Sequence, residues 1–208
     1  MPVIAIDGPA GSGKSTVARA VARRLGVDHL DTGAMYRSVA FAALRDGIDP
    51  ADAAAVAGLV RRVSIEVDDK VMVDGEDATV AIRGPAVSVA VSAVAQNQAV
   101  RTELVRRQRA WVSERRSGVM EGRDIASVVL PDADVKVYLT ASDAERARRR
   151  AGESGQPGHQ EVAADLARRD HIDSSRASSP LVVADGAVVI DTTGHTVEEV
   201  VDAVVALL

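Results

Sequence analysis

A glycine-rich segment with one lysine follows a short apolar run near the start of the chain. Residues 8–15 read Gly-Pro-Ala-Gly-Ser-Gly-Lys-Ser, which fits the spacing G-x-x-x-x-G-K-[ST], and residues 3–6 before them are all apolar. Glycines allow backbone angles closed to other residues and let N–H groups approach an anion. The pattern predicts a phosphate-binding loop between a buried parallel strand and a helix, so the chain should belong to the α/β class.

The residues after the loop support this interpretation over a chance glycine-rich turn. Val17, Val21 and Leu25 share one face of a helix predicted at 15–25, and the positive end of its dipole points at the loop. In such a loop the lysine amine reaches the outer phosphates of a nucleotide, and the serine hydroxyl takes one Mg²⁺ position. We therefore expect ATP to bind at Gly8, Pro9, Ala10, Gly11, Ser12, Gly13, Lys14, Ser15 and Thr16.

Short apolar strands alternate with helices along the rest of the chain. Strands are expected at 3–6, 27–30, about 118–122, 134–140 and 188–190, which predicts a doubly wound, five-stranded parallel sheet. Residues 63–82 instead alternate with period two between acidic turns, as in a small antiparallel sheet. We expect one domain over 1–208, with a core at about 1–37, 99–141 and 176–208, an excursion at about 38–98 and a short lid at about 142–175.

Composition excludes several classes of protein. The formal net charge is −5 and only 2% of residues are aromatic, which argues against nucleic-acid binding. The chain has no cysteine, so disulfides and thiolate metal sites are excluded. It begins directly with the strand and loop and has no apolar run of membrane-spanning length, so we expect no signal segment, no membrane partner and a cytoplasmic location.

Arginines are the candidates for binding the acceptor of a phosphoryl group. Transfer between two nucleotides brings many negative charges together, and several arginines should converge to neutralise them. Arg37 and Arg123 follow predicted strands, which favours a role at the site over the alternative of a solvated surface side chain. Further candidates are Arg101, Arg146, Arg150, Arg169 and Arg176.

Four stretches together resemble the bacterial cytidylate kinases, a family of P-loop nucleoside monophosphate kinases. They are GPAGSGKST (8–16), DTGAMYR (31–37), EGRDIASVVLPDADVKVYL (121–139) and RRDHIDSSRASSPL (168–181), and the resemblance covers essentially the whole chain. It implies ATP-dependent phosphorylation of CMP and dCMP with Mg²⁺. It also implies that the excursion binds the monophosphate, and that the enzyme is a monomer.

The resemblance also implies roles for individual residues. Lys14, Arg123 and Arg176 would be catalytic. Thr32, Arg37, Arg123 and Arg176 would surround the CMP phosphate, and Ser92, Arg101 and Asp124 would read the cytosine edge. Arg169 and Asp173 would contact the ribose. Arg146 would lie against the adenine of ATP, and Arg150 on its phosphates.

Some assignments stay open at this point. Asp124 is either a base-reading carboxylate or the partner of Arg123 or Arg101 in a structural ion pair. Asp31 is either a helix cap or a partner of a Mg²⁺-bound water; Glu121 could act on the metal side too, but we do not assign it. The four histidines (His29, His159, His171 and His195) show no pairing with a second ligand and are expected on the surface or in loops.

Two other functions remain in competition. The same fold could phosphorylate another nucleoside monophosphate or a small metabolite, as a shikimate kinase does. The chain could instead be a nucleotide-dependent switch, but it lacks the guanine-reading pattern N-K-x-D, which argues against this function.

Overall fold

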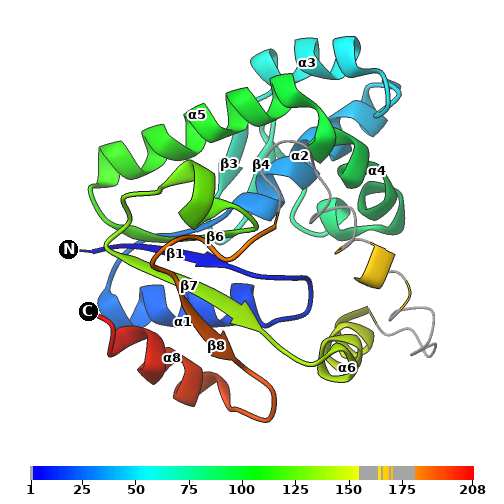
Figure 1. Ribbon diagram of the computed structural model, residues 1–208. Coiled ribbons are helices and arrows are strands. Elements are labelled where there is room, and N and C mark those ends of the chain that lie inside the picture. Colours follow the sequence, from blue (N-terminus) through cyan, green and yellow to red (C-terminus); the bar gives the residue numbers. More distant parts are fainter. Residues whose placement is uncertain (1, 155–163, 165, 169, 171–180) are drawn as a thin grey trace. The chain divides into compact units, whose positions relative to one another are not determined.

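A five-stranded sheet in the order β2-β6-β1-β7-β8 forms the centre of the fold (Figure 1). The computed structural model describes residues 2–154, 164, 166–168, 170 and 181–208. The pairings of β1 with β6, β1 with β7 and β7 with β8 are all parallel, which confirms the predicted α/β fold. The strands are β1 (Val3–Asp7), β2 (His29–Asp31), β6 (Gly118–Gly122), β7 (Val135–Thr140) and β8 (Val188–Asp191).

The order of the strands locates the switch point of the sheet. β2 and β6 lie on one side of β1, with β6 next to it, and the chain then crosses to the other side of β1, where β7 and β8 follow. Open α/β sheets bind ligands beyond the carboxyl ends of their strands at such a point. The glycine-rich loop leaves β1 there.

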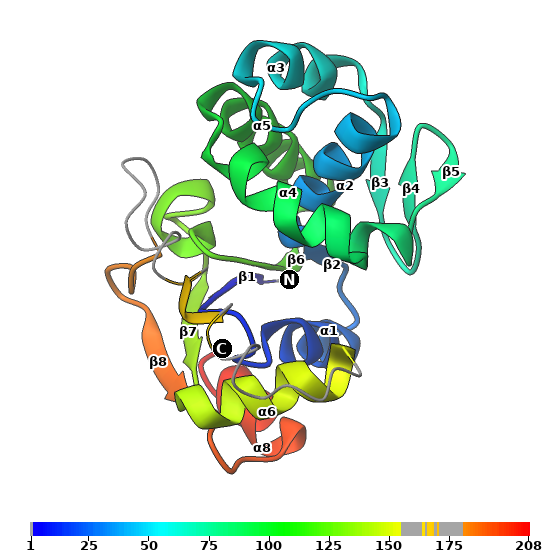
Figure 2. The ribbon, with the colours of Figure 1, turned by 90° about the vertical axis from the view of Figure 1, so that its right-hand side faces the viewer.

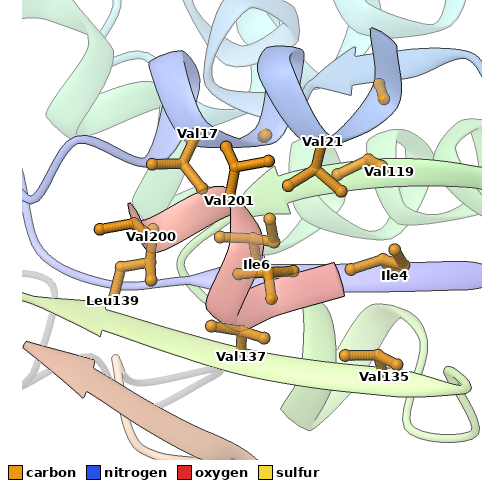
Figure 3. Packing of buried hydrophobic residues seen from close by; sticks show 13 residues of the cluster. Ile4, Ile6, Val17, Val21, Val119, Val135, Val137, Leu139, Val200 and Val201 are labelled. Carbon is orange, nitrogen blue, oxygen red and sulfur yellow. The ribbon is translucent and has the colours of Figure 1, made fainter. Parts of the chain in front are cut away.

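Apolar side chains between the sheet and two helices form the main core (Figure 3). Ile4, Ile6 and Val137 from the strands meet α1 (Lys14–Leu25) and α8 (Val197–Val205), whose own contacts include Val21 and Val201. Each such buried side chain contributes about 1.5–3 kcal/mol. Val200, Val201 and Val204 of α8 are buried, whereas Leu208, beyond the end of α8 at Val205, is 56% exposed.

The chain divides into two compact units, one of residues 1–29 and 112–208 and the other of residues 30–111. Besides β1, β6, β7 and β8, the first unit contains α1, α8, a short turn of π-helix η2 (Ile125–Val129) and α6 (Asp143–Ser154). Residues 155–163, 165, 169 and 171–180, which include part of the lid expected at about 142–175, lie outside the described part of the chain.

The second unit consists of helices and a small antiparallel sheet, as predicted. Val73 in β4 pairs with Ile65 in β3 on one side and with Glu76 in β5 on the other. Helix α2 packs against α4 (Figure 2). The elements are α2 (Thr32–Arg45), α3 (Ala53–Arg62), β3 (Ile65–Val67), β4 (Val71–Val73), β5 (Glu76–Asp77), η1 (Ala81–Arg83), α4 (Pro85–Gln96) and α5 (Gln98–Arg115).

Helix α2 has an aspartate as its N-cap. It starts at Thr32, where the side chain of the preceding Asp31 accepts a hydrogen bond from Ala34 N at 2.9 Å. An aspartate in this position satisfies an amide that the helix leaves unpaired. In the described part of the chain, no helix is long and apolar enough to cross a lipid bilayer.

Candidate active site

The glycine-rich loop has a backbone that favours glycine at three of its positions, Gly8, Gly11 and Gly13. Gly8 has φ 149°, and a Cβ there would lie 2.0 Å from the carbonyl oxygen of Leu139. Gly13, with φ 88°, precedes α1 and provides no side-chain cap for its first amides. Those N–H groups and the helix dipole are suited to an anionic ligand.

Two cationic side chains meet the start of this loop. The Lys14 Nζ donates to Pro9 O at 2.8 Å, and the Arg123 Nη1 donates to Gly8 O at 2.6 Å. Lys14 belongs to α1, whereas Arg123 follows β6, so the sheet brings them together across more than a hundred residues of sequence. Two positive charges beside the N-terminus of a helix form a site that favours phosphate groups.

A buried carboxylate connects the loop serine to a histidine. The Ser15 Oγ donates to Glu121 Oε2 at 2.8 Å, and Glu121 Oε1 lies 3.2 Å from His29 Nε2. Glu121 is only 2% exposed. The His29 side chain is 14% exposed, so the expectation of a surface or loop histidine is wrong there, because β2 carries it to Glu121. His195 is half exposed, and His159 and His171 lie outside the described residues.

Oxygen ligands suited to Mg²⁺ are present at this place. The Ser15 hydroxyl and the neighbouring Glu121 carboxylate are the hard oxygen donors that the ion prefers. Within the described ranges, no group of three acidic, histidine or cysteine side chains could hold a metal alone. These residues therefore fit an ion that keeps several waters and phosphate ligands.

A cavity of about 480 Å³ opens beside the loop. One side consists of Gly11, Ser12 and Gly13, and α6 and the segment leading into α8 form the others. Arg149 is fixed there, because it donates to Glu145, to Thr192 Oγ1 at 2.8 Å and to Thr192 O at 2.8 Å. The further lining residues are Thr16, Val17, Arg148, Gly152, His195, Thr196, Val197 and Val200.

Arg146 packs against the loop, with its side chain 10% exposed. Its guanidinium donates to Ala10 O at 3.1 Å and to Asp143 at 2.6 Å, and it pairs with Asp170. Burial opposes its charge, but the two carboxylates outweigh this and raise its pKa above the ordinary value. Arg146 thus anchors α6 to the loop, and Arg150 lies one turn further along α6.

Asp7, at the end of β1, is a buried acid that the sequence pattern does not single out. It is 2% exposed, and its carboxylate accepts from Ile125 N and Ala126 N at 2.8 Å each. Burial raises its pKa to about 6, although the two amides and Lys14 counteract this effect. Asp124, directly before these amides, is 6% exposed.

The second unit holds the remaining described candidates. Arg37 on α2 donates to Ser88 Oγ at 3.1 Å and to Ile82 O at 3.4 Å. Arg101 on α5 is 4% exposed, and its Cζ lies 5.9 Å from the centre of the Tyr36 ring. Tyr36 directly precedes Arg37 in the sequence. Thr32 is buried at the start of α2, and Ser92 is half-buried on α4.

Three candidates cannot be located. Arg169, Asp173 and Arg176 lie outside the described residues. Asp31 carries out the capping role that the sequence left open, with its second carboxylate oxygen 3.5 Å from Arg83.

The loop, its lysine and the parallel sheet define a P-loop nucleotide-binding fold. The family described as cytidylate kinase matches residues 4–208, and the chain belongs to this family. It is 52% identical to the cytidylate kinase of Mycolicibacterium paratuberculosis, over 96% of this chain and 92% of the relative. It is 50% identical to that of Pelotomaculum thermopropionicum, over 99% of this chain and 95% of the relative. The chain is therefore an enzyme of the kinase class, as its motifs predict.

A solved structure supports the fold alone. The shikimate kinase of Acinetobacter baumannii aligns over 100% of this chain and 92% of its own, with a TM-score of 0.52 and 16% identity. This identity is too low to transfer a substrate, and the small-metabolite alternative is not favoured.

Proposed function

We propose that the chain transfers the terminal phosphoryl group of ATP to CMP and dCMP. An oxygen of the monophosphate attacks the γ-phosphorus in line, the bond to the β-γ bridging oxygen breaks, and CDP or dCDP and ADP leave. The observation that carries the proposal is the convergence of Lys14 and Arg123 on the Gly8–Pro9 carbonyls, in a chain whose family match covers residues 4–208. Two fixed cations at the transferring group stabilise its charge.

ATP would bind with its phosphates along residues 8–16. The cavity between the loop and Thr192 is open next to the loop and of a size suited to a nucleoside, so it supports placing the adenosine there. We keep Arg146 as the adenine contact and Arg150 as a phosphate contact. This role requires Arg146 to share or release its bonds to Asp143 and Asp170 when ATP binds.

The acceptor would be bound by arginines, hydroxyl side chains and carboxylates. Thr32, Arg37, Arg123 and Arg176 would bind its phosphate, and Arg123 and Arg176 would act on the transferring group with Lys14. Ser92, Arg101 and Asp124 would read the base, because a carboxylate accepts from the exocyclic amine of cytosine and repels the carbonyl of uracil. Arg169 and Asp173 would contact the ribose.

Mg²⁺ would enter with ATP and bind to Ser15, with Asp31 acting through a water. When bound, the ion neutralises charge on the β- and γ-phosphates. Glu121 would accept the hydrogen bond of the Ser15 hydroxyl, which would leave a lone pair of Oγ available to the metal.

The remaining properties follow from the reaction. ATP and CMP are cytoplasmic metabolites, so we propose a cytoplasmic location, with no nucleic-acid or membrane partner and a monomeric enzyme. We also propose one kinase domain over 1–208, with its core at about 1–37, 99–141 and 176–208. The monophosphate-binding excursion would span about 38–98, and the lid about 142–175.

ADP release from ATP tests the proposal, measured with each of CMP, dCMP, UMP, AMP and GMP as acceptor. We expect CMP and dCMP to give the highest kcat/KM. Equal turnover with all acceptors, or ATP hydrolysis that no acceptor stimulates, would refute it.

A further inference from the structure

The peptide after Arg123 and Asp124 is capped by a side chain from another strand. Helix η2 starts at Ile125, and the N–H groups of its first residues have no partner within the helix. Asp124 occupies the N-cap position but makes no side-chain cap bond. Asp7, 118 residues away in the sequence, accepts from both Ile125 N and Ala126 N.

In this arrangement the residue at the N-cap position, Asp124, is not the residue that caps the helix, because Asp7 does so. An N-cap carboxylate normally turns back to the amides of its own helix. Because Asp7 binds those amides, the Asp124 carboxylate is not used for them. The same two bonds hold the backbone immediately after Asp124, whose φ of −148° and ψ of 26° lie outside the helical region.

The charges around Asp7 make its ionisation state important. Asp124 raises its pKa and Lys14 lowers it, and Tyr138 is its neighbour across the β1–β7 pair. Burial is the largest influence and brings the pKa to about 6. Asp7 is ionised above this pH and accepts both amides at full strength. Below it, one oxygen carries a proton and accepts poorly.

We propose that Asp7 is a positioning residue for acceptor choice: it caps η2 from β1 and thereby fixes the direction of Asp124 toward the base of the acceptor nucleotide. This inference rests on the proposed function of Asp124. Asp7 touches neither substrate in this account. A displacement of catalytic groups by about 1 Å can cost on the order of a hundredfold in rate, so loss of one cap bond should be measurable.

The test is the ratio of kcat/KM for CMP to that for UMP in Asp7→Asn. The asparagine keeps the shape but presents an NH₂ group to one of two N–H donors, so η2 must shift. We expect the ratio to fall by about tenfold or more, with the KM for ATP changed less than about threefold. Val135→Ala removes core volume from β7 in the same unit and serves as the control; its ratio should match the wild type.

A double-mutant cycle distinguishes positioning from general damage. If Asp7 acts through Asp124, Asp7→Asn should lower the ratio no further in a chain that already carries Asp124→Asn. Independent, additive losses would overturn the inference. So would an Asp7→Asn enzyme with reduced turnover but an unchanged CMP-to-UMP ratio.

The wild type supplies a test that does not depend on a folded variant. The amide proton shifts of Ile125 and Ala126 should titrate together with a midpoint near pH 6, and the CMP-to-UMP ratio should decrease toward acid over the same range. The phosphates of the two acceptors titrate alike and cancel in the ratio. A ratio that is constant from pH 5 to pH 8 would refute the inference, whereas a wild type without CMP preference would refute the proposed function itself.

Discussion

Gly8 is the residue at which the loop depends most on the absence of a side chain. Its φ of 149° strains any other residue, and the Leu139 carbonyl of β7 occupies the space that a Cβ would need. This close approach is possible because β1 and β7 are neighbours in the sheet. Gly47 provides a comparison, since it also has a positive φ, of 68°, but no atom lies within 4 Å of its Cβ position.

Gly8→Ala should therefore destabilise the fold more than Gly47→Ala. Both variants pay for a left-handed backbone, about 1–2 kcal/mol. Gly8→Ala adds the cost of overpacking, about 1–3 kcal/mol. Urea unfolding of the two variants measures the difference in the free energy of unfolding. Equal losses would mean that β7 yields without cost.

Lys14 should be required for turnover and dispensable for folding. Its Nζ donates to Pro9 O, a carbonyl of the loop itself, and the loop contributes little apolar burial. Lys14→Ala should lower kcat by about a hundredfold or more, the effect of removing one fixed charge from a transferring group. The melting temperature should stay close to that of the wild type.

Lys70→Ala is the matched control for this prediction. Lys70 is a lysine in the β3–β4 turn whose side chain is 71% exposed and pairs with Asp77. It should keep normal turnover. A Lys14→Ala enzyme with near-normal kcat, or one that fails to fold, would contradict the catalytic assignment.

At the scale of elements, one arginine on α5 caps the C-terminal end of α3 by donating hydrogen bonds to its carbonyls. Arg107 donates to Val60 O at 2.5 Å and to Val63 O at 2.9 Å, and Glu103 one turn earlier holds its Nε at 2.7 Å. The last carbonyls of a helix lack partners within it, and a cation there also matches the helix dipole. The α3–β3 corner therefore depends on a residue more than forty positions away.

Arg107→Ala should lower the free energy of unfolding by about 1.5–3 kcal/mol, because charged hydrogen bonds to carbonyls are lost. Arg106→Ala removes the other partner of Glu103, but the Arg106 side chain is 66% exposed and water replaces it. Arg106→Ala should lower the free energy of unfolding by less than about 1 kcal/mol. Chemical unfolding at pH 7 compares the two; similar losses would mean that the α3 cap is unimportant.

The same cluster predicts an acid-sensitive contribution to stability. The Arg106 and Arg107 guanidinium groups lower the pKa of Glu103 to about 2. A carboxyl whose pKa is depressed by folding stabilises the native state above its ordinary pKa and loses this effect as the pH falls. We expect a Glu103-dependent loss between about pH 4.5 and pH 2, absent in Glu103→Gln. Identical pH profiles of the two proteins would contradict it.

At the scale of the whole molecule, the sequence predicts elements formed by local patterns better than it predicts contacts between distant residues. The loop, α1 and the small antiparallel sheet follow from spacing and alternation within about twenty residues. Asp7, the His29–Glu121 contact and the Arg146 bond to Ala10 join residues 92 to 136 positions apart, which no periodicity can indicate. The family resemblance supplied the site arginines, whereas the partners that orient them required the structure.

The order in which the two units fold should reflect the distance in sequence between the residues that come into contact. Residues 30–111 form one continuous compact unit, whereas β1 must find β6 and β7 more than a hundred residues away. Closing long loops is slow, so local contacts should form first. Pulse-labelled hydrogen exchange should show amides of α2 and α4 protected before those of β1. Simultaneous protection would indicate a single cooperative step.

The central position of β1 has a consequence during synthesis. This strand is made before the other four strands of its sheet, yet both of its neighbours are complete only when residue 140 has been added. Until then a nascent chain carries an apolar strand with two unpaired edges, the kind of segment that associates with other chains. Translation that stops between α5 and β7 should therefore yield products that chaperones bind or that aggregate, whereas a chain interrupted after β7 has already buried its first strand.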